Sequence, residues 1–291
     1  MLACDLDGTL LMPDGSLSPR TLAALDAARD SGLLVAMVTG RPPRWLSPVV
    51  HQSGWHGLAV AANGAVIADL NVGRVMHTFP IDTDVVHETV TRLRKSIPGV
   101  AFAVEHIEQG QRIPDAPPDL PFPLLRSVGP PAEFGHEPGY QPRLPVAPHT
   151  PIGVIDELIA SGNVVKLLAR APADSEHDAD ETMQRAQDEL AELVTVTHSS
   201  NESVLLEISK IGISKGTGVS WLANEHNIDQ SDVIAVGDMP NDIPMLQWAG
   251  QGYAMGNAHQ LVRDSVGPEH VVPPNTDDGV AQLIESLLHK Q

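Results

Sequence analysis

Short apolar runs alternate with amphipathic stretches through the first 82 of the chain's 291 residues. Residues 2–6 and 33–38 are largely or wholly apolar, a pattern typical of strands buried on both faces. Between them, Ser18 and Pro19 predict the start of a helix, and Gly32 predicts its end. A strand, a helix and a second strand within about forty residues form the βαβ unit of a parallel sheet.

The same alternation continues to residue 79 and resumes after residue 213. In the first part we expect a helix at 43–53, a strand at 58–61 and a hairpin of strands 65–68 and 75–79. In the last part the pattern predicts helices at 214–225, 241–248, 258–264 and 277–289, and strands at 233–236, 253–255 and 270–272. Together these elements predict an α/β fold with a mostly parallel sheet between helical layers.

The middle of the chain has a different character. We expect helices at 84–95, 152–160 and 179–193, and strands at 100–104, 164–169, 194–198 and 204–208. Prolines are so dense in residues 113–151 that we expect little regular structure there, in a segment that is functional or mobile. We therefore interpret the middle section as an α+β insert with separate strands and its own core.

Composition narrows the classes of function. The formal net charge of −19 argues against nucleic-acid and anionic-membrane partners, because both favour clusters of lysine and arginine. The single cysteine, Cys4, allows no intrachain disulfide, and we interpret it as a small buried strand residue rather than a reactive thiol. Without a signal-type or membrane-spanning apolar run, we expect a soluble, cytoplasmic protein.

The candidate chemistry begins with Asp5 and Asp7, at the carboxyl end of the first strand. Residues i and i+2 of a strand share a face, so both carboxylates can point to the sheet edge where open α/β folds bind ligands. Two carboxylates this close repel each other, and a hard cation such as Mg²⁺ would relieve that repulsion. Taken alone, the pair would more often be a strand end followed by a solvated Asp-Gly turn.

Three more signals follow predicted strands at the same edge. Singly, they could be a turn residue, a surface lysine and a helix N-cap. The lysine, Lys215, occupies the first turn of its predicted helix, where the macrodipole disfavours a cation unless an anion binds nearby. Together with the aspartate pair they favour a site for a metal and an anion. The three signals are Thr39-Gly40, Lys215, and Gly237-Asp238 with Asn241-Asp242.

These motifs resemble those of haloacid dehalogenase-superfamily phosphatases, in the Cof-like branch with a type IIB cap, over nearly the whole chain. The resemblance implies a Rossmann-like three-layer core from residues 1–82 and 210–291, with an α+β cap inserted at 83–209. Pro240 and the proline-rich segment depart from the family pattern. The matching motifs are Asp5 to Thr9, Val38 to Arg41, Asn63-Gly64, Ser214 to Gly216, Gly237 to Asp242, Ala254 to Ala258 and Asp278 to Val280.

The resemblance also implies roles for the aspartates. Asp5 would attack phosphorus and form an aspartyl-phosphate, while Asp7 would protonate the leaving oxygen and later activate water. Mg²⁺ would be held by the Asp5 carboxylate, the Asp7 backbone carbonyl and Asp238. Spacing alone does not say which aspartate attacks.

The remaining motif residues would handle the phosphoryl group. Lys215 would screen its charge and that of Asp5, and Asp242 would orient Lys215 or a metal-bound water. Asn241 would share that orienting role or bind phosphate. The other predicted phosphate-binding residues are Thr39, Gly40 and Gly8.

The insert would select the substrate. The few aromatic residues favour a small sugar phosphate over a nucleobase or flavin ester. Candidate substrate contacts are Arg41, Arg44, Asn63 and Lys166, with Arg126, Arg143 and Arg170 as further cations of the insert. We expect a small phosphoester as the partner, and a monomer or small homo-oligomer.

Three alternative functions could account for the same motifs. A phosphomutase would return the phosphoryl group to a sugar, and the absence of free phosphate would reveal it. A non-enzymatic phospho-receiver needs neither Asp7 nor the insert. A carbohydrate-binding or scaffold protein with a relict site is disfavoured because every core motif residue is present.

Overall fold

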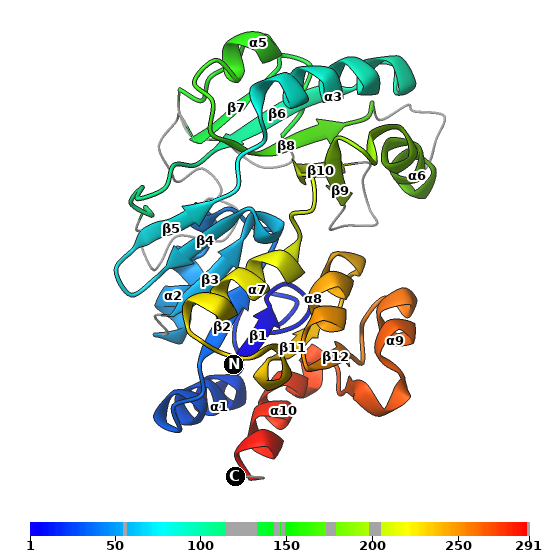
Figure 1. The fold of residues 1–291 in the computed structure, drawn as a ribbon. Helices are drawn as coiled ribbons and strands as arrows, with labels where there is room; N and C mark the ends of the chain where they lie inside the picture. Colours follow the sequence, from blue (N-terminus) through cyan, green and yellow to red (C-terminus); the bar gives the residue numbers. More distant parts are fainter. Residues whose placement is uncertain are drawn as a thin grey trace.

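The computed structural model describes residues 1–54, 57–114, 133–142, 146, 149–172, 179–197 and 205–289. These residues build two β-sheets, which we call the large sheet and the small sheet (Figure 1). The chain starts in the large sheet, builds the small sheet, and then returns to complete the large one. This confirms the predicted fold class, a mostly parallel α/β core with an inserted α+β layer.

The large sheet has the strand order β13-β12-β11-β1-β2-β3-β4-β5. Its strands are parallel from β13 to β3, while β3, β4 and β5 pair antiparallel. The first strand is therefore central, with its carboxyl end at the middle of the sheet edge. The strands are β1 Leu2–Asp5, β2 Val35–Val38, β3 Leu58–Ala61, β4 Val66–Asp69, β5 Arg74–Thr78, β11 Ile234–Gly237, β12 Gln251–Met255 and β13 Val271–Val272.

Helices cover both faces of the large sheet. Helix α1 packs against α10, while α7, α8 and α9 pack in succession on the opposite face, as right-handed crossovers require. The predicted cap of α1 is present, because the Ser18 side chain accepts a hydrogen bond from the backbone N–H of Thr21. The helices are α1 Pro19–Asp30, α2 Ser47–Ser53, α7 Lys215–Glu225, α8 Ile243–Trp248, α9 Gln260–Val266 and α10 Gly279–Leu288. Three short 3₁₀ turns matter for the site: Pro43–Trp45, Ala62–Gly64 and Pro240–Asp242.

The small sheet is antiparallel, with the order β7-β6-β8-β10-β9. Alternate strand residues, such as Leu167 and Ile208, form an apolar cluster with the helices α3 and α6. The small sheet therefore has its own core, as predicted for the insert. Its strands are β6 Ala101–His106, β7 Phe134–His136, β8 Val164–Arg170, β9 Val194–Thr197 and β10 Leu205–Lys210, and its helices are α3 Thr83–Ser96, α5 Ile155–Leu158 and α6 Ala179–Leu190.

Two expectations for the insert need correction. Within the proline-rich segment, Phe134–His136 forms a strand, which is possible because these three residues contain no proline and lie at the sheet edge. The helix expected at 152–160 begins only at Ile155, since Ile152 forms a bridge to His136. Most of residues 113–151 lie outside the described part of the chain. The exact limits 1–82, 83–209 and 210–291 stay predictions.

Candidate active site

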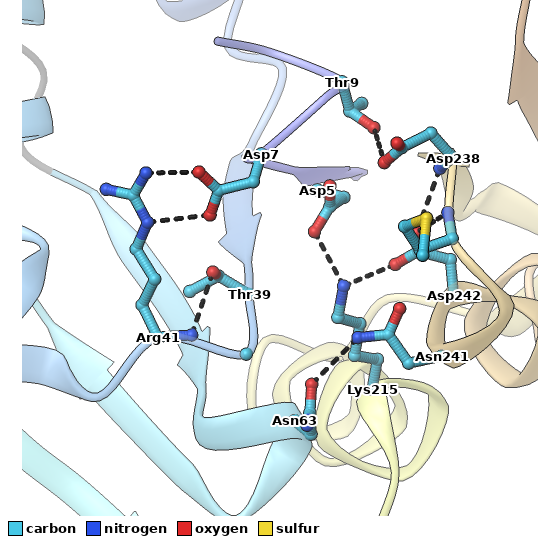
Figure 2. A network of polar contacts seen from close by, with 12 residues as sticks. Asp5, Asp7, Thr9, Thr39, Arg41, Asn63, Lys215, Asp238, Asn241 and Asp242 are labelled. Carbon is cyan, nitrogen blue, oxygen red and sulfur yellow. Dashed lines mark hydrogen bonds and ion pairs between the residues drawn. The ribbon is translucent and has the colours of Figure 1, made fainter. Parts of the chain in front are cut away.

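Three buried ionisable side chains meet where β1 ends. Lys215, the first residue of α7, donates hydrogen bonds to Asp5 Oδ1 at 2.6 Å and to Asp242 Oδ1 at 2.5 Å (Figure 2). The position of Lys215 follows from its helix cap, because the Ser214 side chain accepts a hydrogen bond from the backbone N–H of Thr217. None of the three charged side chains exceeds 6% exposure. The lysine is therefore fixed between two carboxylates that come from distant parts of the sequence.

Asp242 has both carboxylate oxygens engaged. While Oδ1 accepts from Lys215, Oδ2 accepts from the backbone N–H groups of Asp238 and Met239, each at 2.9 Å. These bonds close the turn after β11 and hold Asp238 in place. Asp242 thus contacts both the loop and Lys215, and the orienting role expected for it stays a prediction.

Asp238 lies against the loop that follows Asp5. Thr9 Oγ1 donates to Asp238 Oδ1 at 3.0 Å. Gly8 has a φ of +82°, and a Cβ added there would lie 2.3 Å from Asp238 Oδ2. Only glycine satisfies both the backbone conformation and this close approach. The loop is therefore built to bring Asp238 next to Asp5.

The site carries more negative than positive groups. Burial, followed by the Asp242 charge, raises the pKa of Asp5 well above its ordinary value, and Lys215 opposes this. Burial, with Asp242 as the next cause, raises the pKa of Asp238 to about 6. Burial lowers the pKa of Lys215, but Asp242 and Asp5 outweigh it and the net direction is up. One ammonium does not neutralise three neighbouring carboxyl groups, so a bound cation would stabilise the site.

The donor set fits a hard divalent cation. Carboxylate oxygens of Asp5, Asp238 and Asp242 all lie within 4.8 Å of one another, and such oxygens are the ligands that Mg²⁺ prefers. Because Lys215 and two amides already occupy the Asp242 oxygens, Asp5 and Asp238 are the residues that would hold the ion.

The Asp7 side chain differs from the sequence expectation. Its carboxylate is 59% exposed and turns away from Asp5 toward Arg41, whose guanidinium donates to both of its oxygens, with Nε–Oδ2 at 2.7 Å (Figure 2). Strand β1 ends at Asp5, so the rule that residues i and i+2 share a face does not extend to Asp7. A bidentate arginine contact then fixes the direction of the carboxylate.

The end of β2 contributes a buried hydroxyl. Thr39 is 1% exposed, and its Oγ1 accepts the backbone N–H of Arg41 at 3.1 Å. Asn63, in the left-handed turn after β3, donates its backbone N–H to the Thr39 carbonyl at 3.0 Å. Asn241 Nδ2 donates to Asn63 Oδ1 at 3.1 Å, which joins this part of the site to the loop that holds Asp242.

The cations expected to meet substrate already have protein partners. Lys166 Nζ donates to the Gly40 carbonyl at 2.7 Å and lies 3.3 Å from Glu207. Arg44 pairs with Glu105 through two hydrogen bonds, one of them 2.9 Å long. Their contact with substrate stays a prediction.

The other cations of the insert named from the sequence contact different groups or lie outside the described residues. The Arg170 guanidinium lies over the Tyr140 ring, 5.3 Å from its centre. Arg126 and Arg143 lie outside the described residues.

Sequence reasoning missed three glutamates of the insert. Glu105 and Glu207 lie on the face of the small sheet opposite its helices, and Glu133 lies 3.8 Å from Arg44. Burial raises the pKa of Glu133 to about 7, with Arg44 lowering it and Glu105 raising it. An available signal was the alternation within strands, since Glu105 and Glu207 each follow an apolar residue of the other face.

The fold and this arrangement of aspartates, threonine and lysine define a hydrolase of the phosphoryl-transfer type. The haloacid dehalogenase-like hydrolase family matches residues 2–284, and the chain belongs to it. This membership confirms the family predicted from the motifs, and with it a phosphatase-class enzyme.

Two curated relatives match over nearly their whole length. The 5-amino-6-(5-phospho-D-ribitylamino)uracil phosphatase YwtE of Bacillus subtilis is 26% identical, with 100% of this chain and 98% of the relative covered. The pyridoxal phosphate phosphatase YbhA of Escherichia coli is also 26% identical, with 99% and 98% covered.

A solved structure shows the same fold. The sugar phosphatase BT4131, of HAD subclass IIB, superposes with a TM-score of 0.73 at 19% identity, covering 98% of each chain. In the described part of the present chain, no helix is both long enough and apolar enough to cross a bilayer.

Proposed function

We propose that the protein is a Mg²⁺-dependent phosphatase that hydrolyses a small phosphorylated metabolite through an aspartyl-phosphate. The observation that carries this proposal is the buried contact of Lys215 with Asp5, beside Asp238. A carboxylate whose charge is screened by an ammonium suits a nucleophile that must approach an anionic phosphoryl group, and the neighbouring Asp238 would help to hold the cation. Mg²⁺, when bound, supplies positive charge that offsets the repulsion between nucleophile and substrate.

In the first step, a carboxylate oxygen of Asp5 forms a bond to phosphorus as the bond from phosphorus to the leaving oxygen breaks. Asp7 gives its proton to that leaving oxygen. In the second step, Asp7 takes a proton from water, whose oxygen attacks phosphorus and releases phosphate and the free Asp5 carboxylate. Because Asp7 here contacts Arg41, its side chain must rotate away from the guanidinium before it can act.

The phosphoryl oxygens are held by groups around the same sheet edge. Thr39 supplies a buried hydroxyl, and the Gly40 and Gly8 backbones, with Asn241, complete the set of proposed contacts. Lys215 stays protonated between Asp5 and Asp242 and screens the charge that accumulates in the transition state. Asp242 keeps the lysine in that position.

For the substrate, we propose a small, hydroxyl-rich ester such as a sugar phosphate. Residues 83–209 would act as the cap, with residues 1–82 and 210–291 as the catalytic core. The chain has few aromatic residues that could stack on a nucleobase or flavin ring, which supports a sugar ester over esters of those groups. The curated relatives act on a phosphoribitylamino-uracil and on pyridoxal phosphate, so esters of both kinds belong in the test.

The test is phosphate release from a panel of sugar phosphates, nucleotides, pyridoxal phosphate and an aryl phosphate, with Mg²⁺ or with EDTA. Asp5→Asn should lose at least about a thousandfold in kcat because the amide is not a nucleophile. Asp84→Asn, at an exposed position of α3, is the matched control and should keep full activity. Retention of more than a few per cent of activity by Asp5→Asn would overturn the nucleophile assignment. Phosphoryl return to sugar without release of phosphate would instead indicate a phosphomutase.

A further inference from the structure

A buried ion pair on the small sheet faces the proposed phosphoryl site. Lys166 of β8 and Glu207 of β10 are 3% and 8% exposed, and their charged atoms lie 3.3 Å apart. Their strand neighbours Leu167, Leu206 and Ile208 pack into the cluster beneath α3 and α6. Because strand side chains alternate between faces, Lys166 and Glu207 project from the opposite face, toward the large sheet.

Lys166 contacts the backbone of the loop after β2. Its ammonium donates to the Gly40 carbonyl at 2.7 Å, and the peptide that contains this carbonyl also contains the Arg41 N–H. That N–H donates to Thr39 Oγ1 at 3.1 Å. Hydrogen bonds therefore fix both the carbonyl and the N–H of the Gly40–Arg41 peptide. Because the Thr39 hydroxyl accepts a hydrogen bond from this peptide, its own proton is free to be donated to another group. The lysine therefore acts on the orientation of the Thr39 hydroxyl through one peptide.

Glu207 reaches a second part of the site. Its carboxylate accepts a hydrogen bond from Asn63 Nδ2, and Asn63 Oδ1 accepts from Asn241 Nδ2 at 3.1 Å. Gly40 lies against this chain, since a Cβ there would be 3.0 Å from Asn63 Oδ1 and 3.5 Å from Glu207 Oε2. A single ion pair is therefore connected to two groups proposed to bind phosphoryl, Thr39 and Asn241.

We propose that Lys166 and Glu207 are positioning residues that complete the phosphoryl site from the small sheet, acting through Gly40 and Asn63 rather than on the substrate's leaving group. This inference rests on the proposed function, because it assigns Thr39 and Asn241 to the phosphoryl group. It implies that the site has its full affinity for a phosphoryl oxyanion only while the small sheet lies on the large one. It also implies that the contribution of Lys166 is independent of what the phosphoryl group is attached to.

The experiment is a double-mutant cycle of Lys166→Met and Thr39→Val, read by calorimetric binding of orthovanadate with Mg²⁺ present. Lys166→Met should weaken vanadate binding by about tenfold or more, as expected for loss of a hydrogen bond from a charged donor. In the Thr39→Val background, the same change should cost less than about threefold, because its effect passes through Thr39. If the loss of vanadate affinity in the double variant equals the product of the losses in the two single variants, the proposal is overturned.

Steady-state kinetics separates positioning from contact with the leaving group. Lys166→Met should reduce kcat/KM by the same factor for an aryl phosphate and for a sugar phosphate. Unchanged vanadate affinity together with a loss confined to one ester would show that Lys166 binds the leaving group, and the proposal would fail. Lys166→Arg keeps a charged donor and should bind vanadate more tightly than Lys166→Met. If both variants are folded, a role of Lys166 in folding alone would not produce this difference.

Two further variants keep the test decisive. Lys166→Met with Glu207→Gln removes both buried charges and replaces the single variant if that one does not fold. Lys95→Met, exposed near the end of α3, is the lysine control and should bind vanadate like the wild type. If the wild type hydrolyses esters but Lys166→Met binds vanadate as tightly as the wild type, this inference fails and the proposed function stands. Coupled vanadate binding without hydrolysis of any ester would instead defeat the proposed function.

Discussion

Two buried charged clusters of the molecule have similar chemistry but different construction. Lys215 with Asp5 and Asp242 belongs entirely to the large sheet and its helices. Arg44 with Glu105 and Glu133 connects the large sheet to the insert. The first cluster keeps its geometry within one layer, whereas the second exists only when two layers are in contact. We infer that the first serves the chemical step and the second the attachment of the insert.

Among the tests of this comparison between clusters, Lys215→Met has the largest expected effect. It leaves Asp5 and Asp242 buried without a cation, so we expect a loss of about 3–5 kcal/mol in the free energy of unfolding. We also expect kcat to fall by about a hundredfold or more, since a preorganised charge at the phosphoryl group is removed. Urea unfolding and phosphate release measure the two losses. A variant with wild-type kcat would contradict the screening role of Lys215, and Lys95→Met is the matched control.

A second effect concerns the cation. Mg²⁺ should raise the stability of the wild type by about 2–3 kcal/mol at a concentration a hundred times its Kd. Asp238→Asn should abolish most of this gain, because Asp238 and Asp5 are the proposed ligands. Thermal unfolding with increasing MgCl₂ gives the measurement, and Asp84→Asn should respond like the wild type. An undiminished gain in Asp238→Asn would place the ion elsewhere.

The smallest effect tests the second cluster through pH. Burial raises the pKa of Glu133 from 4.5 to about 7. The folded state then binds a proton that the unfolded state has lost, so this group's contribution to stability is full below about pH 4.5 and disappears as pH rises through 7. Glu133→Gln should remove that loss. Between pH 5 and pH 7.5, the free energy of unfolding of the variant should therefore rise by about 1–3 kcal/mol relative to that of the wild type.

Unfolding at the two pH values, with Glu157→Gln at an exposed position of α5 as control, measures the difference. The kcat of Glu133→Gln should stay within about twofold of wild type, because the cluster lies outside the proposed chemical step. A large fall in kcat with no change in the pH dependence of stability would reverse the comparison between the two clusters.

The sequence predicted the large-sheet cluster better than the insert. Lys215 could be placed because its helix cap and the alternation of strands and helices are local signals, and parallel strands bring their carboxyl ends to one edge. The direction of Asp7 could not be predicted, since it depends on where β1 ends and on a guanidinium 34 residues away. The partners of Lys166 are equally long-range, because Gly40 lies 126 residues away.

The central claim is that Asp5 carries the phosphoryl group during turnover. The most direct measurement is rapid acid quenching after mixing with a phosphoryl-labelled substrate, followed by peptide mapping of the label. We predict acid-stable, base-labile label on the peptide that contains Asp5, more of it in Asp7→Ala because water is no longer activated, and none in Asp5→Asn. Steady turnover of the wild type with no label on that peptide, or label that persists in Asp5→Asn, would contradict the account.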